Sequence, residues 1–141
     1  MTKKITIKNC QVINEGQIFE SDLLIEDGRI SKIDSSIDSQ GDVVDAKGLY
    51  LMPGVIDDQV HFREPGLTER GSIKTESLSA IAGGTTSFMD MPNVLPPTLS
   101  LDLWREKISI AEQNASANFS FYMGTSNTNR SEEHTSELQS P

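Results

Sequence analysis

Residues 51–66 read LMPGVIDDQVHFREPG, a short apolar run followed at once by charged and hydrogen-bonding side chains. Val55 and Ile56 favour a buried β-strand, and Pro65 with Gly66 favours the loop that follows it. In parallel α/β folds, ligands bind at the carboxyl ends of the strands. The stretch therefore predicts a functional site at the end of this strand.

Two side chains at this predicted strand end suit a metal ion and an anion. His61 offers an imidazole, and Arg63 offers a planar fork of donors that matches a carboxylate. The alternation of a strand places residues 59, 61 and 63 on one side, an arrangement that suits a hydrolase acting on an acidic substrate. The alternative is a loop with one hydrogen-bonded histidine and one solvated arginine. On these residues alone, that alternative is the more common case.

The overall composition excludes several classes of protein. A net charge of −9 and a pI near 4.6 argue against a nucleic-acid-binding surface, which needs a basic stripe. No apolar run is long enough to cross a membrane, and no export signal follows the first lysines, so we expect a cytoplasmic protein. The single cysteine, Cys10, has no partner for an internal disulfide.

The first 45 residues are typical of short strands joined by tight turns. Ile5 and Ile7 alternate with polar residues, residues 23–25 are apolar, and Asp27-Gly28 is a strong hairpin signal. So few strands leave exposed edges when they stand alone. We therefore expect this segment to be one part of a larger β-structure.

After residue 66 the pattern changes to alternating helices and strands, which is typical of βα units around a parallel sheet. Ser72 suits the N-cap of a helix that ends at Gly83-Gly84, and a strand is expected over 85–91. A second helix is expected over 100–113, with Trp104 on its apolar face as a core residue. A third strand is expected over 117–124.

The string around His61, together with Met91-Pro92-Asn93, resembles the signature of dihydroorotase, a cyclic amidohydrolase. That signature reads Asp-x-His-x-His followed by Phe or Leu and Arg-Glu-Pro-Gly. The resemblance implies that His61 binds zinc and that Arg63 and Asn93 hold the substrate carboxylate. Gln59 stands where the family has its first histidine, and a neutral amide is a poorer zinc ligand than an imidazole.

The resemblance also implies the fold and the activity. The expected fold class is α/β, with residues 1–50 as the N-terminal part of a small β-sandwich. Residues 51–129 would form the first two to three βα units of an incomplete metal-dependent hydrolase TIM barrel. The implied reaction is the reversible interconversion of N-carbamoyl-aspartate and dihydroorotate in pyrimidine synthesis, with one or two zinc ions. The remaining metal ligands and the general base of the family lie on later strands, so no catalytic residue is expected in this chain and the chain alone is expected to be inactive.

The last twelve residues, 130–141, differ from the rest of the chain. They match the conceptual translation of a common short-read sequencing adapter, and we interpret them as a non-native tail. His134 is therefore excluded as a metal ligand. Recovery of the genomic reading frame beyond Asn129 tests this interpretation, and the same twelve codons in the genome would contradict it.

Other functions stay open at this stage. An allantoinase or dihydropyrimidinase is the alternative enzyme, although Arg63 and Asn93 favour a carboxylate-bearing substrate over the uncharged rings of those relatives. A non-catalytic homologue that acts as a scaffold is the alternative from another class. The expected partner is the small-molecule substrate, with neither nucleic acid nor membrane. Whether the chain also binds a second copy of itself or another pyrimidine-pathway enzyme is left open.

Overall fold

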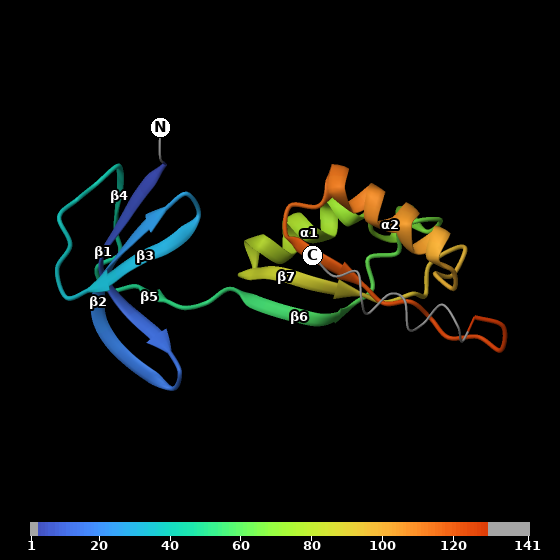
Figure 1. Cartoon of the computed structure of the whole chain (residues 1–141), viewed down its shortest axis with the longest axis horizontal. Coiled ribbons are helices and arrows are strands. Elements are labelled where there is room, and N and C mark those ends of the chain that lie inside the picture. The colour runs from blue at the N-terminus through green and yellow to red at the C-terminus, as the bar shows by residue number, and fades with distance from the viewer. Residues whose placement is uncertain (1–2, 130–141) are drawn as a thin grey trace. The chain divides into compact units, whose positions relative to one another are not determined.

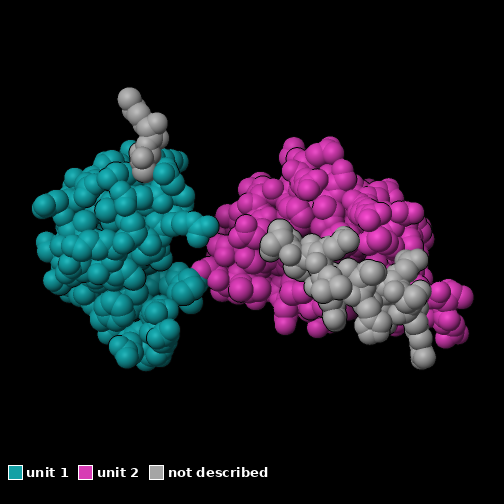
Figure 2. Space-filling view, in the orientation of Figure 1, with its two compact units in different colours: residues 1–53 teal, residues 54–141 magenta. Residues whose placement is uncertain are grey.

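The computed structural model describes residues 3–129 and divides the chain into two compact units, residues 1–53 and 54–141 (Figures 1 and 2). The predicted adapter-derived segment and His134 lie outside the described residues. Neither helix in the described part of the chain combines the length and the apolar character needed to span a membrane.

Unit 1 is a mixed five-stranded sheet, in which two consecutive hairpins are extended by two short strands that pair in parallel. The strand order is β3-β2-β1-β4, and β5 also pairs with β1. The strands are β1 (Lys4–Asn14), β2 (Gln17–Glu26), β3 (Arg29–Asp34), β4 (Asp42–Asp45) and β5 (Tyr50–Leu51). The predicted Asp27-Gly28 hairpin is confirmed, with positive φ angles of 48° and 78° that suit a two-residue turn. An equivalent hairpin, not predicted from the sequence, turns at Glu15-Gly16, where φ is 49° and 74°.

A buried carboxylate stabilises an irregularity in the middle of β1. The pairing of β1 with β2 shifts between Ile7 and Cys10, and Asn9 adopts a φ of 59° there. Asp22 on β2 accepts hydrogen bonds from the backbone N–H groups of Asn9 and Ile37, each at 2.9 Å, and pairs with the Lys8 ammonium. The hydrogen bond from Lys8, followed by those from the backbone, lowers the pKa of Asp22 to about 2.

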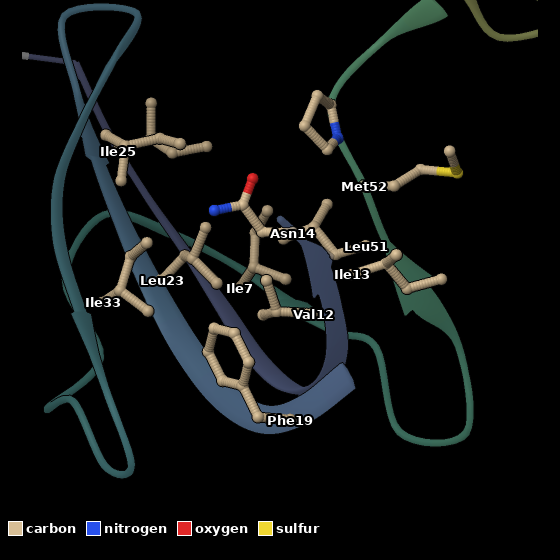
Figure 3. Close-up of a pocket in the computed structure, with 12 residues that line it drawn as sticks. Ile7, Val12, Ile13, Asn14, Phe19, Leu23, Ile25, Ile33, Leu51 and Met52 are labelled. Carbon is tan, nitrogen blue, oxygen red and sulfur yellow. The ribbon is translucent and has the colours of Figure 1, made fainter. Parts of the chain in front are cut away.

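Apolar side chains gather on one face of this sheet (Figure 3). Cys10, Val12, Leu23 and Ala46 form the buried cluster, and Ile7 and Leu51 pack against it. The cluster borders a shallow pocket of about 260 Å³, whose other lining residues include Phe19 and Met52. The small core of unit 1 therefore continues into an open apolar surface.

Unit 2 has the βαβαβ order that the sequence predicted. Three parallel strands, β6 (Val55–Val60), β7 (Thr85–Asp90) and β8 (Asn118–Phe121), pair in the order β6-β7-β8. The connections contain a 3-10 turn, η1 (Thr68–Arg70), and the helices α1 (Ile73–Ala82) and α2 (Leu101–Asn114). The side chains of Ser72 and Ser100 cap the two helices by accepting backbone N–H groups. The predicted α/β class, a β module followed by the first βα units, is confirmed.

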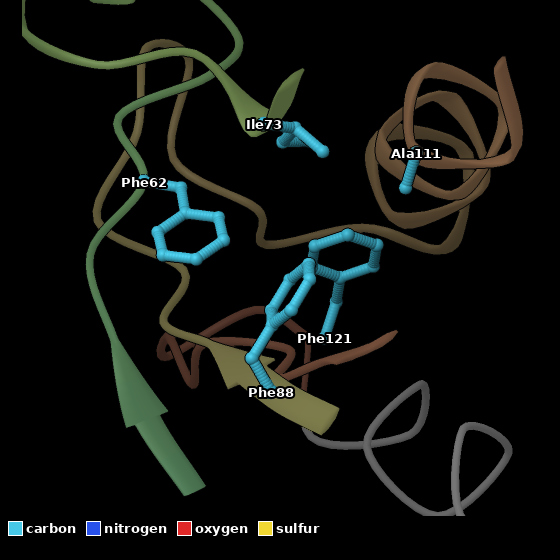
Figure 4. Packing of buried hydrophobic residues seen from close by; sticks show 5 residues of the cluster. All are labelled: Phe62, Ile73, Phe88, Ala111 and Phe121. Carbon is cyan, nitrogen blue, oxygen red and sulfur yellow. The ribbon is translucent and has the colours of Figure 1, made fainter. Parts of the chain in front are cut away.

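The core of unit 2 lies between its sheet and its helices. Phe62, Ile73, Phe88, Ala111 and Phe121 form the buried cluster (Figure 4). The rings of Phe62 and Phe88 have centroids 4.5 Å apart. Trp104 packs against this cluster and donates its indole N–H to the carbonyl of Phe121 at 2.9 Å, as expected for a core residue.

Two predictions about the strand β6 are wrong. Val55 and Ile56 are not buried but expose 48% and 69% of their surface, because β6 is an edge strand with a neighbour on one side only. The alternation of side chains also stops before Arg63, since β6 ends at Val60 and Arg63 has a φ of 66°. Residues 59, 61 and 63 therefore do not share one strand face.

Candidate functional site

The structure brings His61 and Asn93 into direct contact at the ends of neighbouring strands. His61 follows β6, and Asn93 lies in the loop after β7. The imidazole Nδ1 lies 2.8 Å from the Asn93 Oδ1, although the two residues are 32 positions apart in the sequence. An amide oxygen can only accept, so Nδ1 carries the hydrogen in this contact, and in the neutral imidazole Nε2 then has a lone pair. Both residues are exposed to solvent.

Arg63 lies two residues beyond His61, with its backbone in the left-handed region at φ 66°. Its carbonyl accepts a hydrogen bond from the Leu67 N–H at 3.0 Å, which closes a tight turn after the strand. Within residues 3–129, the guanidinium forms no ion pair with an acidic side chain. Its donors are therefore available for an external anion.

The rest of the Arg-Glu-Pro-Gly stretch builds the loop. The Glu64 carboxylate accepts the N–H of Ile73, the first residue of α1, at 2.7 Å. This bond satisfies a free donor at the start of a helix and is favoured by the helix dipole. A Cβ atom added at Gly66 would lie 1.8 Å from the Leu95 carbonyl oxygen, so only glycine permits the close approach of these two loops.

A buried ion pair lies directly behind the site. Lys107 of α2 and Asp90 at the end of β7 both have fully buried side chains, with the ammonium nitrogen 2.8 Å from Asp90 Oδ2. That ammonium donates to the carbonyl of Met91 at 2.9 Å, and it lies 4.9 Å from the centre of the Phe121 ring. The other carboxylate oxygen, Oδ1, accepts the backbone N–H of Phe62 at 3.0 Å.

Lys107 was not predicted as a buried residue from the sequence. Burial lowers the pKa of this lysine, and the neighbouring Asp90 carboxylate opposes that shift. A lysine among the apolar positions of a helix was the available signal, because a lysine is almost never fully buried without a partner. The partner lies 17 residues earlier in the sequence, on a strand, so the helix pattern alone does not identify it.

Gln59 lines an open depression at the ends of the three strands, apart from the His61 contact. The depression measures about 490 Å³, and its walls come from the last part of β6, including Asp58, and from the segments after β7 and β8, including Met91 and Tyr122. The Gln59 backbone N–H bonds to the Asp57 carboxylate at 3.1 Å. His61, Arg63 and Asn93 lie outside the lining of this depression.

The described residues do not make up a metal site by themselves. Within residues 3–129, no three or more histidine, cysteine, aspartate or glutamate side chains are grouped so that they could hold an ion. His61 offers one imidazole nitrogen, whereas zinc sites in proteins use three or four protein ligands. The predicted zinc therefore lacks most of its ligands in the described part of the chain.

Known proteins with similar sequences are hydrolases of cyclic amides. The chain is 37% identical over 123 residues to an L-hydantoinase from Paenarthrobacter aurescens, covering 85% of this chain and 27% of that protein. It is 36% identical over 126 residues to an allantoinase from Bacillus velezensis, covering 88% and 28%. It is 37% identical over 117 residues to a dihydroorotase from Methanosarcina acetivorans, covering 82% and 25%. The chain thus spans about a quarter of the length of these relatives.

A solved structure agrees with the sequence matches. The L-hydantoinase (dihydropyrimidinase) from Arthrobacter aurescens matches 98% of this chain and 31% of its own, with a TM-score of 0.91 and 33% identity. No known protein-family profile matches the chain. Proteins named for three different substrates are therefore similar to the chain at nearly the same level of identity.

Proposed function

Because the chain belongs to the cyclic amidohydrolase superfamily, we propose that it supplies the carboxylate-binding part of a dihydroorotase-like site. The reaction of the whole protein would be the reversible interconversion of N-carbamoyl-aspartate and dihydroorotate in pyrimidine synthesis. The observation that carries this proposal is the 2.8 Å contact between His61 and Asn93, since it joins the two motifs at one sheet edge.

The donor set at this edge suits a carboxylate. Because His61 occupies the Oδ1 atom of Asn93, the two N–H donors of the Asn93 amide remain for a ligand. Arg63 adds a guanidinium without an ionic partner among residues 3–129. Charge-assisted hydrogen bonds of this kind are about twice as strong as neutral ones, and the planar fork of arginine fixes the orientation of the carboxylate.

His61 is proposed as a zinc ligand through Nε2. Its Nδ1–H is held by Asn93, which is the usual arrangement for a metal-binding histidine whose second nitrogen is oriented by a neighbouring acceptor. Gln59, at the position of the family's first histidine, offers only a neutral amide oxygen. Asn93 would then link the metal ligand and the substrate, with its oxygen on His61 and its nitrogen on the carboxylate.

A hydantoinase or allantoinase activity is the second candidate. Its support is the similarity to the L-hydantoinase, in both sequence and structure, and to the allantoinase. The rings of hydantoin and allantoin carry no carboxylate, so these substrates would leave the Arg63 guanidinium without an anionic partner. The two candidates therefore differ in what they predict for Arg63.

Ligand binding to the purified chain tests the proposal and separates the candidates. In NMR titrations with N-carbamoyl-aspartate and with uncharged hydantoin, we expect the anionic ligand to shift the resonances of Arg63 and Asn93. Hydantoin should shift them far less. Arg63→Lys should weaken the anion's effect, because a single ammonium cannot form the two parallel bonds of a guanidinium. Equal binding of the two ligands, or an unaltered response in Arg63→Lys, would contradict the proposal.

Enzymatic assays of the chain address its predicted inactivity separately. We expect no hydrolysis of dihydroorotate above a control with zinc alone, because the described residues supply neither a complete ligand set nor an assigned general base. Turnover above that control, abolished by His61→Ala, would show that the chain alone is active.

A further inference from the structure

The fully buried charge pair behind the site has no role in the proposed ligand contacts. Asp90 and Lys107 each expose 0% of their side chains, so both charges are completely removed from water. Such a pair is weak evidence for stability, since the desolvation of two ions offsets most of their attraction. The pair therefore calls for an explanation other than the stability of unit 2.

The contacts of Asp90 point to the segment that carries the candidate site. Its Oδ1 atom accepts the N–H of Phe62 at 3.0 Å, and Phe62 lies between His61 and Arg63. This segment lies beyond the end of β6, where the strand pairing no longer fixes the backbone. The last pairing bonds next to it, Met91 N–H to the Val60 carbonyl and Tyr122 N–H to the Asp90 carbonyl, are each 3.0 Å long and do not involve the ion pair.

We propose that Asp90 is a positioning residue for His61 and Arg63, and that Lys107 keeps the Asp90 carboxylate in place. Asp90 fixes the peptide between these two residues through the Phe62 N–H, so that the imidazole reaches Asn93 and the backbone turn at Arg63 starts from a fixed position. Lys107 neutralises the buried carboxylate and also bonds the carbonyl of Met91, two residues before Asn93. This inference rests on the proposed function for its biological meaning, but the geometry that it predicts can be measured without activity.

Two double variants separate positioning from simple core stability. Asp90→Asn/Lys107→Met removes both charges but keeps an oxygen that can accept the Phe62 N–H. Asp90→Leu/Lys107→Met removes both charges and that acceptor, with side chains of similar size. The two variants therefore differ in the amide group at residue 90, whose oxygen is the acceptor for the Phe62 N–H, and neither leaves an unpaired buried charge.

The measured quantity is the tautomer of His61. The chain has two histidines, so His134→Gln in all samples leaves His61 as the only imidazole. Long-range proton–nitrogen NMR spectra at about pH 8.5, where imidazole in model peptides is neutral, report which ring nitrogen carries the hydrogen. We expect separate Nδ1–H and bare Nε2 resonances in the parent chain and in the Asn/Met variant. In the Leu/Met variant the two resonances should converge, as in an imidazole that exchanges between tautomers.

Each other outcome has a definite meaning. Separate resonances in the Leu/Met variant would overturn the positioning role. Loss of the native spectrum in that variant alone would also overturn it, because a residue that only positions the loop should leave the core cluster intact. Hydrogen exchange adds a test that needs no variant: a Phe62 amide that exchanges as fast as an exposed amide would also refute the proposal. If the parent chain itself lacks the Nδ1–H tautomer, the contact between His61 and Asn93 fails and the proposed function fails with it.

Discussion

Replacement of Lys107 by methionine alone should strongly destabilise unit 2. Methionine can follow the path of the lysine stem, but it leaves the Asp90 carboxylate buried at 0% exposure without its cation. It also removes the 2.9 Å hydrogen bond to the Met91 carbonyl. Breaking a buried ion pair by removing one partner costs about 3–5 kcal/mol.

The double variant Asp90→Asn/Lys107→Met is the matched control for this prediction. It removes both charges and keeps an acceptor for the Phe62 N–H, so it leaves no unpaired buried ion. We expect it to recover most of the loss and to lie within about 1–2 kcal/mol of the parent, since one neutral hydrogen bond is worth about 1 kcal/mol. The recovery would show that the cost of the single variant comes from the isolated carboxylate.

Urea unfolding followed by fluorescence measures both free energies in unit 2. Trp104 is the chain's single tryptophan, and its indole N–H bonds to the Phe121 carbonyl beside the core cluster. Its signal therefore reports the unfolding of this unit and not that of unit 1. A loss below about 1 kcal/mol in Lys107→Met, well under the 3–5 kcal/mol of a broken buried pair, would refute the reasoning. A double variant no more stable than the single one would refute it as well.

Three further predictions concern the core, unit 1 and the metal. Phe88→Ala should cost unit 2 about 3–5 kcal/mol in the same urea assay, because it empties the centre of the aromatic cluster. The Asp22 carboxylate should stabilise unit 1 fully above its unfolded pKa of 3.8, and this contribution should be lost as the pH falls through about 2. Acid unfolding followed by circular dichroism measures it, and Asp22→Asn should abolish the pH dependence. Gln59→His should tighten zinc binding by about tenfold, or about 1.4 kcal/mol, in calorimetric titrations, whereas equal affinities would show that residue 59 does not face the metal.

The order of elements in unit 2 was predictable from the sequence because its signals are local. Ser72 and Ser100 cap helices with their own hydroxyl groups, within three residues of the bonds that they form. The Asp27-Gly28 turn likewise depends on two adjacent residues that tolerate positive φ angles. In each case the residues that determine the structure lie next to one another in the chain.

The wrong and missed predictions depend on contacts between distant residues. The apolar character of Val55 and Ile56 indicated a strand correctly, but their exposure depends on how many neighbours that strand has. The turn at Arg63 ends the alternation of side chains that the sequence alone would extend from β6 to this residue. A lysine in a helix is usually solvated, and Lys107 is buried only because the strand that carries Asp90 lies beside α2.

The signature around His61 combines residues that build the loop with residues that meet a ligand, and the structure separates the two. Glu64 and Gly66 serve the fold, one by capping α1 and the other by admitting the Leu95 carbonyl. Gln59 has an exposed side chain that forms no hydrogen bond within residues 3–129, and its backbone N–H bonds to the Asp57 carboxylate. A change from histidine to glutamine at this position therefore costs the fold little, while it removes an imidazole that a metal could use. Similarity of fold and competence for metal chemistry are thus independent here, which is why zinc affinity has to be measured separately from stability.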